Sequence, residues 1–301
     1  MELWIPITIA AAFLQNLRSA VQKHLKNVMG TTGATFVRFG FGMPFALLFV
    51  SFLHYGLGYA MPRTNSAFYL WAIIGGIGQI AATFLLVHLF SFRNFAVGTA
   101  YSRTEPAQAA LFGLMFLGER VTAGVLAAIA ISVFGVMLIS VAHMAVGWRS
   151  LFTSIFSRNA LIGLASGTCF GISAVAYRAA SLALGGPNFI MQAAVTLAFV
   201  ITFQTAIMLA WMLAKDRAEI GRIKKAWKPA LFTGLVGASA SFGWFSAMTL
   251  QQAAVVKSLA QIEMLFTFAS SVFVFKEKIN RFEIAGCVLI VCGILMLIAI
   301  G

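Results

Sequence analysis

Charged side chains are scarce in this chain of 301 residues. Lys, Arg, Asp and Glu together make up 10% of it, whereas a soluble globular domain averages about 25%. Hydrophobic residues account for 61% of the chain, and the mean hydropathy is +0.94. A composition this apolar excludes an ordinary soluble protein and predicts an integral membrane protein.

Acidic residues are scarcer still, with eight Asp and Glu against 21 Lys and Arg and a net charge of +13. Such an excess can indicate a nucleic-acid partner, but here the cations cluster in short loops between apolar runs. Loops of that kind face the cytoplasm and are attracted to anionic lipid headgroups. We therefore predict contact with the lipid bilayer and no nucleic-acid partner.

Cysteines and catalytic motifs are also few. The three cysteines lie inside apolar runs, so they form neither a disulfide framework nor a metal-ligand spacing. There is no phosphate-binding glycine loop, no His-Glu-x-x-His motif and no serine–histidine pairing. We predict no cofactor, no metal and no enzymatic activity, and keep a membrane-embedded lipid-modifying enzyme as a less favoured alternative. Without a nucleotide-binding motif, active transport would run on an ion or solute gradient.

What the chain does contain is a series of apolar runs, each close to the roughly 20 residues that a transmembrane helix needs. The first run lacks the basic flank and the cleavage site of a signal peptide, so we expect it to be retained as a helix. The connecting loops are short. Ten runs qualify: residues 5–25, 34–55, 68–91, 96–117, 121–144, 160–180, 188–213, 229–250, 253–275 and 282–300.

Ten helices divide into two sets of five. Because five is an odd number, a duplicated five-helix unit runs inverted in its second copy. The predicted fold is therefore an all-α integral membrane protein of ten transmembrane helices in two inverted five-helix repeats. We expect the first repeat at residues 3–144, a connecting loop at 145–159 and the second repeat at 160–300.

A pattern that occurs twice supports this duplication. In each half a Glu lies inside an apolar run, a second Glu follows 14 residues later in a loop, and a Gly follows 16 residues after that. The two copies are 158 residues apart, and the first helices of the two halves match at an offset of 154. The matched residues are Glu105 with Glu263, Glu119 with Glu277, Gly135 with Gly293, Gly76 with Gly234, and Ser19 with Ser173.

The loop cations predict an orientation. With the helix ends given above, 14 Lys and Arg fall on the face that holds the 215–228 loop, and three fall on the other face. Lysine and arginine are enriched in cytoplasmic loops, so the first face is predicted to be cytoplasmic and both termini to lie outside. We expect a multi-pass protein of the cytoplasmic (inner) membrane.

Glu105 and Glu263 lie about nine and ten residues into their predicted helices, near the middle of the bilayer. A charge there costs several kcal/mol unless it is paired or solvated, which makes intramembrane acids candidates for function. Since burial disfavours the charged form of a carboxyl group, either residue could bind and release a proton, or hold an amine of the substrate. The alternative is a structural ion pair that fixes helix packing.

Cations also lie inside the apolar runs. Arg103 is two residues from Glu105, so the two side chains point to different faces. We expect Arg103 or Lys257 to pair with the acid of the opposite half, or else to leave a cation free for a carboxylate or phosphate. Arg18 lies deep in the first helix and is a candidate anion partner. Arg38 is about one turn inside its helix and is expected to snorkel to the interface.

Four uncharged polar residues complete the candidate substrate-binding or proton-binding site. Each lies within a predicted helix, near a charged residue or near the bilayer centre, where its side chain would contact the substrate or bridge two helices. They are Gln15, Gln79, Gln261 and Tyr101, which in a continuous helix lies one turn before Glu105 and on the same face.

Other features indicate packing. Gly163, Gly167 and Gly171 form a small-xxx-small ladder that is typical of close helix contact, and Trp244 is interpreted as packing or lipid contact. Pro106 is expected to bend its helix and free a backbone carbonyl. The second half has Met264 in that place, so the proline is not duplicated.

The turn before the last helix of each half carries a further pattern. It reads Leu117-Gly118-Glu119-Arg120-Val121-Thr122 in the first half and Phe275-Lys276-Glu277-Lys278-Ile279-Asn280 in the second. With ten helices in two halves, the chain resembles the EamA type of the drug/metabolite transporter superfamily over essentially its whole length. The Arg103-Thr104-Glu105 segment departs from the more apolar version that is common in that family.

The resemblance implies a secondary carrier of small metabolites, often an exporter, with an alternating-access cavity between the halves. It also implies cytoplasmic termini, opposite to the loop charges. We predict a secondary active exporter of a small polar or zwitterionic metabolite such as an amino acid, with proton coupling as one option. The alternative is an organic-anion or phosphate-ester carrier or exchanger. A monomer is compatible with either.

Overall fold

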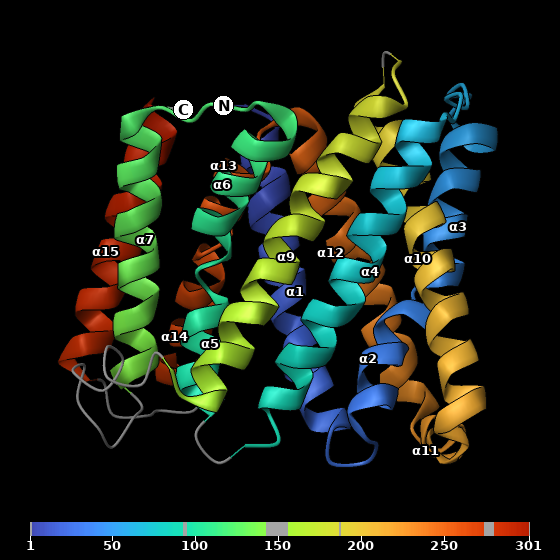
Figure 1. Ribbon diagram of the computed structural model, residues 1–301, viewed down its shortest axis with the longest axis horizontal. Helices are drawn as coiled ribbons and strands as arrows, with labels where there is room; N and C mark the ends of the chain where they lie inside the picture. The colour runs from blue at the N-terminus through green and yellow to red at the C-terminus, as the bar shows by residue number, and fades with distance from the viewer. Residues whose placement is uncertain (1, 93–94, 143–155, 187, 274–279, 301) are drawn as a thin grey trace.

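The computed structural model describes residues 2–92, 95–142, 156–186, 188–273 and 280–300. Every regular element in these ranges is helical, which confirms the predicted all-α fold (Figure 1). Glu277 and four loop cations of the orientation argument lie outside the described residues: Arg93, Arg149, Lys276 and Lys278.

The helices of the two halves follow one another along the chain. The first half contains α1 (Trp4–Leu25), α2 (Thr31–Gly40), α3 (Met43–Ser51), the π-helical turn η1 (Phe52–Gly56), α4 (Ser66–Leu89), α5 (Phe95–Ser102), α6 (Glu105–Leu117) and α7 (Ala123–Ala142). The second half contains α9 (Arg158–Ala183), α10 (Phe189–Lys215), α11 (Arg217–Lys225), α12 (Trp227–Leu250), α13 (Ala253–Leu259), α14 (Ile262–Phe273) and α15 (Arg281–Ile300).

Ten membrane crossings are built from these elements. Within the described residues, seven crossings are long and apolar enough to be candidate spans by length and composition, with α2, α3 and η1 counted as one. The other three are α1, the pair α5 and α6, and the pair α13 and α14. Helix α1 is 22 residues long and is set apart by its polar residues, which include Arg18. The two pairs are set apart by their breaks, because their helices are only 7 to 13 residues long, and they carry the charges Arg103, Glu105, Lys257 and Glu263.

Contacts between the halves follow the inverted repeat. Helix α1 packs along α12, and its counterpart α9 packs along α4. At the seam between α7 and α15, a Cβ added to Gly135 would lie 2.7 Å from the carbonyl oxygen of Gly286. The repeat-equivalent contact is made by Gly293, where an added Cβ would lie 2.9 Å from the carbonyl oxygen of Ala128. The same close approach thus occurs twice about a pseudo-two-fold axis, as an inverted duplication requires.

Two of the predicted helices are interrupted. Residues 96–117 form α5 and α6 with a break at Arg103–Thr104, and residues 253–275 form α13 and α14 with a break at Ala260–Gln261. The prediction of two continuous helices is therefore wrong. The breaks lie near mid-height of the molecule, where the chain of each half changes from one short helix to the next (Figure 1).

The first break has a local cause, and a hydrogen bond between the halves joins the two breaks. Pro106 has no amide hydrogen to donate to the carbonyl four residues before it. This interrupts the helix expected at residues 96–117. The second half has no proline there, yet its helix breaks at the matching place. Across the two breaks, the side-chain Nε2 of Gln261 donates to the main-chain oxygen of Arg103 at 3.3 Å. A carbonyl freed at one break is thus bound from the other, as buried backbone requires.

The second crossing is also divided, contrary to the single helix expected at residues 34–55. Helix α2 ends at Gly40, and α3 begins at Met43 with a proline in its first turn. A Cβ at Gly42 would lie 2.9 Å from the side chain of Ile201, so this bend packs tightly against the second half.

The glycine ladder of α9 packs on the broken helix of the first half. Added Cβ atoms at Gly163 and Gly171 would meet the backbones of Gly98 and Ala109, and one at Gly167 would lie 2.9 Å from the Ser102 carbonyl oxygen. This contact confirms the close packing that the small-xxx-small spacing indicates, and it supports the chain on both sides of the break.

Both chain termini lie at one end of the molecule, and α11 lies at the other (Figure 1). At the α11 end, the Glu219 carboxylate accepts hydrogen bonds from the backbone amides of Gly30 at 2.8 Å and Gly33 at 3.1 Å. Glu219 is fully buried and also pairs with Arg222. The carboxylate of the second half therefore caps the N-terminus of α2 in the first half, where the helix dipole favours an anion.

Replacing Glu219 with Gln should lower the thermal midpoint of the purified protein by several degrees. The change replaces charge-assisted hydrogen bonds, worth about 1.5–3 kcal/mol each, with neutral ones worth about 0.5–1.5 kcal/mol, and it removes the favourable helix-end charge. Asp216→Asn is the matched control, because Asp216 directly precedes α11, the helix that contains Glu219, and its side chain makes no capping hydrogen bond. Equal thermal midpoints for the two variants would contradict this account of the cap.

Candidate functional site

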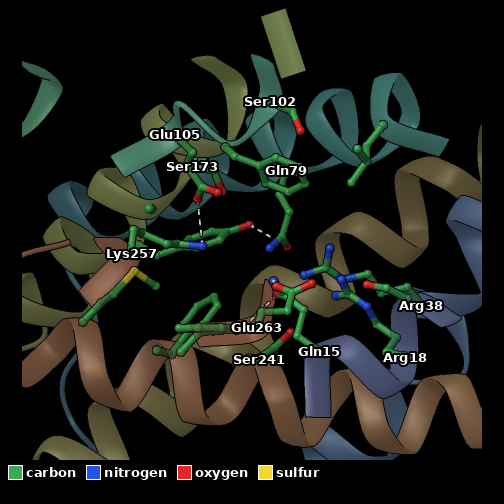
Figure 2. A pocket seen from close by; sticks show the side chains of 18 of the residues that line it. Gln15, Arg18, Arg38, Gln79, Ser102, Glu105, Ser173, Ser241, Lys257 and Glu263 are labelled. Carbon is green, nitrogen blue, oxygen red and sulfur yellow. Dashed lines mark hydrogen bonds and ion pairs between the residues drawn. The ribbon is translucent and has the colours of Figure 1, made fainter. Parts of the chain in front are cut away.

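A polar cavity lies between the two halves, where the helix breaks meet α1, α2, α4, α9 and α12 (Figure 2). It offers about 60 Å³ to the centres of water-sized molecules, and one buried water needs roughly 10–15 Å³ by that measure. In this conformation the cavity therefore has room for a few waters or a small solute. Its charged lining residues are Arg18, Arg38, Arg103, Glu105, Lys257 and Glu263.

Two crossed ion pairs join the halves inside this cavity. Arg103 of the first half binds Glu263 of the second through two parallel hydrogen bonds, each 3.1 Å long. Lys257 of the second half lies 2.8 Å from Oε1 of Glu105 in the first half. This second contact is an ion pair without an aligned hydrogen bond, since Glu105 Oε1 has no hydrogen-bond partner. Of the two arrangements expected for these cations, the structure has the cross-paired one.

The helix breaks place each charge at a suitable helix end. Glu105 is the first residue of α6, and Glu263 lies in the first turn of α14. Lys257 lies in the last turn of α13, and Arg103 directly follows α5. Helix N-termini stabilise anions and C-termini stabilise cations, by about 0.3–1 kcal/mol each and up to ~2 kcal/mol when partly buried.

Pairing is needed because isolated charges are costly at this depth. A charged residue at the centre of a membrane helix costs about 2.5–3.5 kcal/mol on insertion scales. The side chain of Glu263 is 4% exposed, so it depends on its partners more than Arg103, which is 26% exposed. Breaking such a pair by removing one partner is more damaging than removing both, because a lone charge then remains buried.

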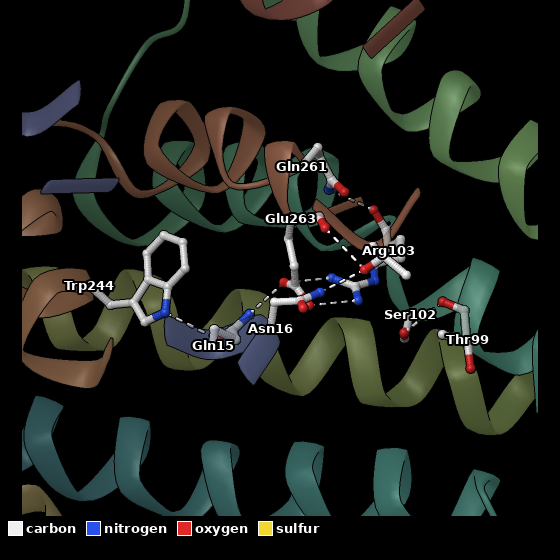
Figure 3. A network of polar contacts seen from close by, with 9 residues as sticks. Gln15, Asn16, Thr99, Ser102, Arg103, Trp244, Gln261 and Glu263 are labelled. Atoms are coloured by element: carbon white, nitrogen blue, oxygen red, sulfur yellow. Dashed lines mark hydrogen bonds and ion pairs between the residues drawn. The ribbon is translucent and has the colours of Figure 1, made fainter. Parts of the chain in front are cut away.

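A polar network orients Glu263 (Figure 3). Besides Arg103, Gln15 donates to Glu263 Oε2 at 2.9 Å, and the indole N–H of Trp244 donates to Gln15 at 2.9 Å. The ring of Trp244 also lies under Lys257, with Nζ 4.9 Å from the ring centroid, a cation–π contact. Trp244 packs in the buried core, as interpreted, and in addition it links the two ion pairs.

Arg18 and Arg38 form no ion pair with any described acid. Arg38 is 3% exposed and donates to the hydroxyl of Thr83 at 3.1 Å, so it does not snorkel to the interface as expected. Its helix, α2, packs against α4, α10 and α12, which enclose the side chain. Arg18 is 5% exposed, and its Nε and one terminal nitrogen have no hydrogen-bond partner.

Gln79 belongs to a second cluster of neutral polar groups. Its Oε1 accepts from the Tyr177 hydroxyl at 3.0 Å and from Gln204 Nε2 at 3.0 Å, and Gln204 also reaches the Gly76 carbonyl. The cluster ties α4, α9 and α10 together while Gln79 and Tyr177 still line the cavity. Both roles considered for Gln79, helix bridging and cavity lining, are thus present.

Two predicted site residues lie away from the cavity. Tyr101 is 6% exposed and packs with Ala100, Ala160 and Met137. Gln261 is 4% exposed and bonds the Arg103 backbone. Tyr101 was predicted from the spacing of a continuous helix, and the break after Ser102 removes that spacing relation to Glu105.

Sequence reasoning did not name Ser173, Tyr177 or Ser241 as candidates, although all three line the cavity. For Ser173 a signal existed, because it matches Ser19 in the repeat and both serines line the same cavity. Residues at equivalent positions near a pseudo-two-fold axis meet across it, so repeat-matched polar residues point to a shared site.

A cluster of contacts joins the two halves between the cavity and the end where the termini lie. Arg178 follows the lining residue Tyr177 and donates to the main-chain oxygens of Met248 at 2.7 Å and Gln251 at 2.8 Å. It also pairs with Glu119 in the turn after α6. The repeated loop glutamate of the first half therefore bonds to the second half. Among the described residues, no group of His, Cys, Asp and Glu could hold a metal ion.

The comparisons agree with this architecture. A family model described as the EamA-like transporter family matches residues 2–141 and 157–299. The chain belongs to the EamA-like transporter family. A solved structure titled "Crystal structure of protein" has a TM-score of 0.72 and 17% identity, covering 97% of this chain and 94% of that one. At this identity the likeness shows the fold alone. No curated protein matches the chain.

Family membership confirms the predicted class. The chain is a multi-pass membrane transporter rather than an enzyme, its substrate is a small molecule, and its two family repeats imply the ten-helix fold. The cavity between these repeats is therefore the candidate substrate site.

The crossed ion pairs predict non-additive stability changes. Arg103→Gln and Glu263→Gln should each lower the thermal midpoint, because each leaves a buried charge without its partner, a loss of about 3–5 kcal/mol for well-buried pairs. The double variant should melt higher than either single variant. Thermal unfolding of the four proteins in one detergent gives the coupling energy, and additive effects would show that the pair is not a unit.

Proposed function

We propose that this chain is a gradient-driven transporter of a small polar metabolite, with the charged cavity as its alternating binding site. One observation carries the proposal: the cavity is lined by ionised residues from both halves of an inverted repeat, at the breaks of two helices. In transporters of this architecture, substrates bind at such breaks near the bilayer midplane.

The two ion pairs suit different roles. Arg103 holds Glu263 in two aligned hydrogen bonds, and Gln15 adds a third. Lys257 and Glu105 form an ion pair without an aligned hydrogen bond, and the Glu105 side chain is 19% exposed. Glu105 is therefore the acid more easily separated from its cation when substrate enters. A carboxylate left unpaired in a low dielectric favours proton uptake, which would couple substrate movement to a proton.

Contacts at each end of the molecule provide the closures that alternating access requires. Arg178 with Glu119 joins the halves at the end of the termini, and Glu219 with the start of α2 joins them at the α11 end. Rocking of one half against the other would release one of these contacts at a time. We propose that the protein lies in the cytoplasmic (inner) membrane and that its lysine-rich α11 end faces the cytoplasm, as the loop charges indicate.

Proteoliposome flux tests the function directly. The purified protein should move at least one labelled compound from a panel of amino acids, carboxylates and phosphate esters, above the flux in protein-free liposomes. An imposed pH gradient should change that flux. Glu105→Gln should abolish the response to the pH gradient, since the amide cannot carry the proton.

Asp216→Asn is the matched control for this experiment, because Asp216 directly precedes α11 and lies outside the cavity. It should retain both the flux and the response to the pH gradient. The absence of protein-dependent flux for every compound class would overturn the proposed function. A pH response retained in both Glu105→Gln and Glu263→Gln would remove these acids from the coupling step.

Cysteine labelling tests the access path. A single cysteine at Ser173, in a chain whose Cys169, Cys287 and Cys292 are replaced by Ala, places one thiol in the cavity lining. Arg178→Gln should increase its labelling by an impermeant thiol reagent from the side of the termini, because it loosens the closure there. Equal labelling with and without Arg178 would contradict the assigned closure.

A further inference from the structure

We infer that the transported substrate bears an anionic carboxylate or phosphate group, which binds between the guanidinium groups of Arg18 and Arg38. The inference rests on the proposed function and narrows its substrate class. It favours the organic anion over the amine-bearing metabolite as the cargo of this cavity.

The charge balance of the cavity is the first reason. Four cations and two acids line it: Arg18, Arg38, Arg103 and Lys257 against Glu105 and Glu263. Each acid already has a cation from the opposite half. The remaining two cations are Arg18 and Arg38, so the lining carries an excess of two positive charges in a low-dielectric space. Buried charges are stable when paired, and an anionic ligand would supply the missing partner.

The position of the two arginines is the second reason. A Cβ added at Gly237 of α12 would touch both side chains, with Arg18 Cδ at 3.2 Å and Arg38 Cγ at 3.7 Å. The aliphatic parts of the two side chains therefore lie side by side, one from α1 and one from α2. Figure 2 shows the two guanidinium groups next to each other at one end of the cavity, facing the Glu263 carboxylate. Two adjacent guanidinium groups present planar sets of donors that match a carboxylate or a phosphate.

Unused hydrogen-bonding capacity is the third reason. Arg18 is 95% buried, and its Nε and one terminal nitrogen have no hydrogen-bond partner. Buried donors of this kind are normally satisfied, so an unpaired set in a cavity lining points to a ligand. The acid that faces the two arginines is Glu263, but its two carboxylate oxygens already accept three hydrogen bonds from Arg103 and Gln15.

The other surroundings of the pair fit an organic anion and do not fit an amine. The Thr83 hydroxyl accepts a hydrogen bond from Arg38, and the Tyr177 hydroxyl is hydrogen-bonded to Gln79 and Gln204. Both hydroxyl groups are uncharged, so neither neutralises a cation. A substrate amine would enter a lining that is already positive. Phe170 and Met248 give the remaining wall an apolar character, which would cover a short carbon skeleton attached to the anionic group.

Ligand-dependent thermal unfolding of the purified protein in detergent tests the inference without transport. The probes are acetate, succinate, inorganic phosphate and glycerol 3-phosphate at constant ionic strength, against succinamide, glycerol and putrescine. At least one anion should raise the thermal midpoint with increasing concentration, while the neutral and cationic compounds should not. The carboxylate and phosphate arms then distinguish the two chemistries.

The variants Arg18→Gln and Arg38→Gln should each weaken binding of the active anion at least tenfold. Arg63→Gln is the matched control, because Arg63 is exposed in the loop before α4, and it should bind as the wild type does. In the absence of ligand, Arg18→Gln should melt no lower than wild type, since it removes an unpaired buried cation. A purely structural arginine would instead lower the midpoint when replaced.

The outcomes separate the two proposals. No response to any anion, a response to putrescine alone, or full anion binding in the Arg18→Gln/Arg38→Gln double variant would each overturn the anion site. Anion binding that depends on both arginines, without flux in proteoliposomes, would support the site and contradict the transport proposal. Flux of an amine or a neutral compound with no anion binding would support transport and overturn the anion site.

Discussion

Two crossed ion pairs, Arg103 with Glu263 and Lys257 with Glu105, are the interaction on which the centre of this protein depends. Each pair has one member in each half, so neither half can satisfy its own charges. The charges sit where each of two helices breaks, and a break is tolerated at membrane depth only where its backbone lines a cavity or is bound by protein. Ion pairs, broken helices and cavity therefore form one structural unit.

Much of the fold could be predicted because the length of each apolar run and the spacing of the repeat can both be read directly along the sequence. The ten crossings and their inverted relation follow from run lengths and from matches 158 residues apart, and the repeated contacts of Gly135 and Gly293 agree with them. The break in the second half could not be predicted this way. It has no proline, and the contact made there, from the Gln261 side chain to the Arg103 carbonyl, joins residues 158 apart in the sequence.

The site was predictable in its charges and less so in its geometry. Pairing between opposite halves follows from Arg103 and Glu105 pointing to different faces. Arg38 was misplaced because its distance from the helix end says nothing about α4, α10 and α12, which enclose it. Tyr101 was assigned from a helical spacing that the break removes. The matched serines Ser19 and Ser173 show that the repeat itself carries site information when its polar matches are followed.

The same symmetry explains why the site has to be asymmetric. Positions 103 and 261 are equivalent in the repeat, and they touch across the pseudo-two-fold axis. An arginine at 261 as well would add a further cation beside a cavity whose lining already has four cations and two acids, which is unfavourable in a low dielectric. Arg103 is therefore matched by a neutral Gln261, although the acids at 105 and 263 are both retained. The second acid must then take its cation from elsewhere, and Lys257 supplies it from a position whose repeat equivalent is Thr99. The duplicated acids at the axis thus have unequal cations, so one pair is tightly bonded and the other is open to exchange.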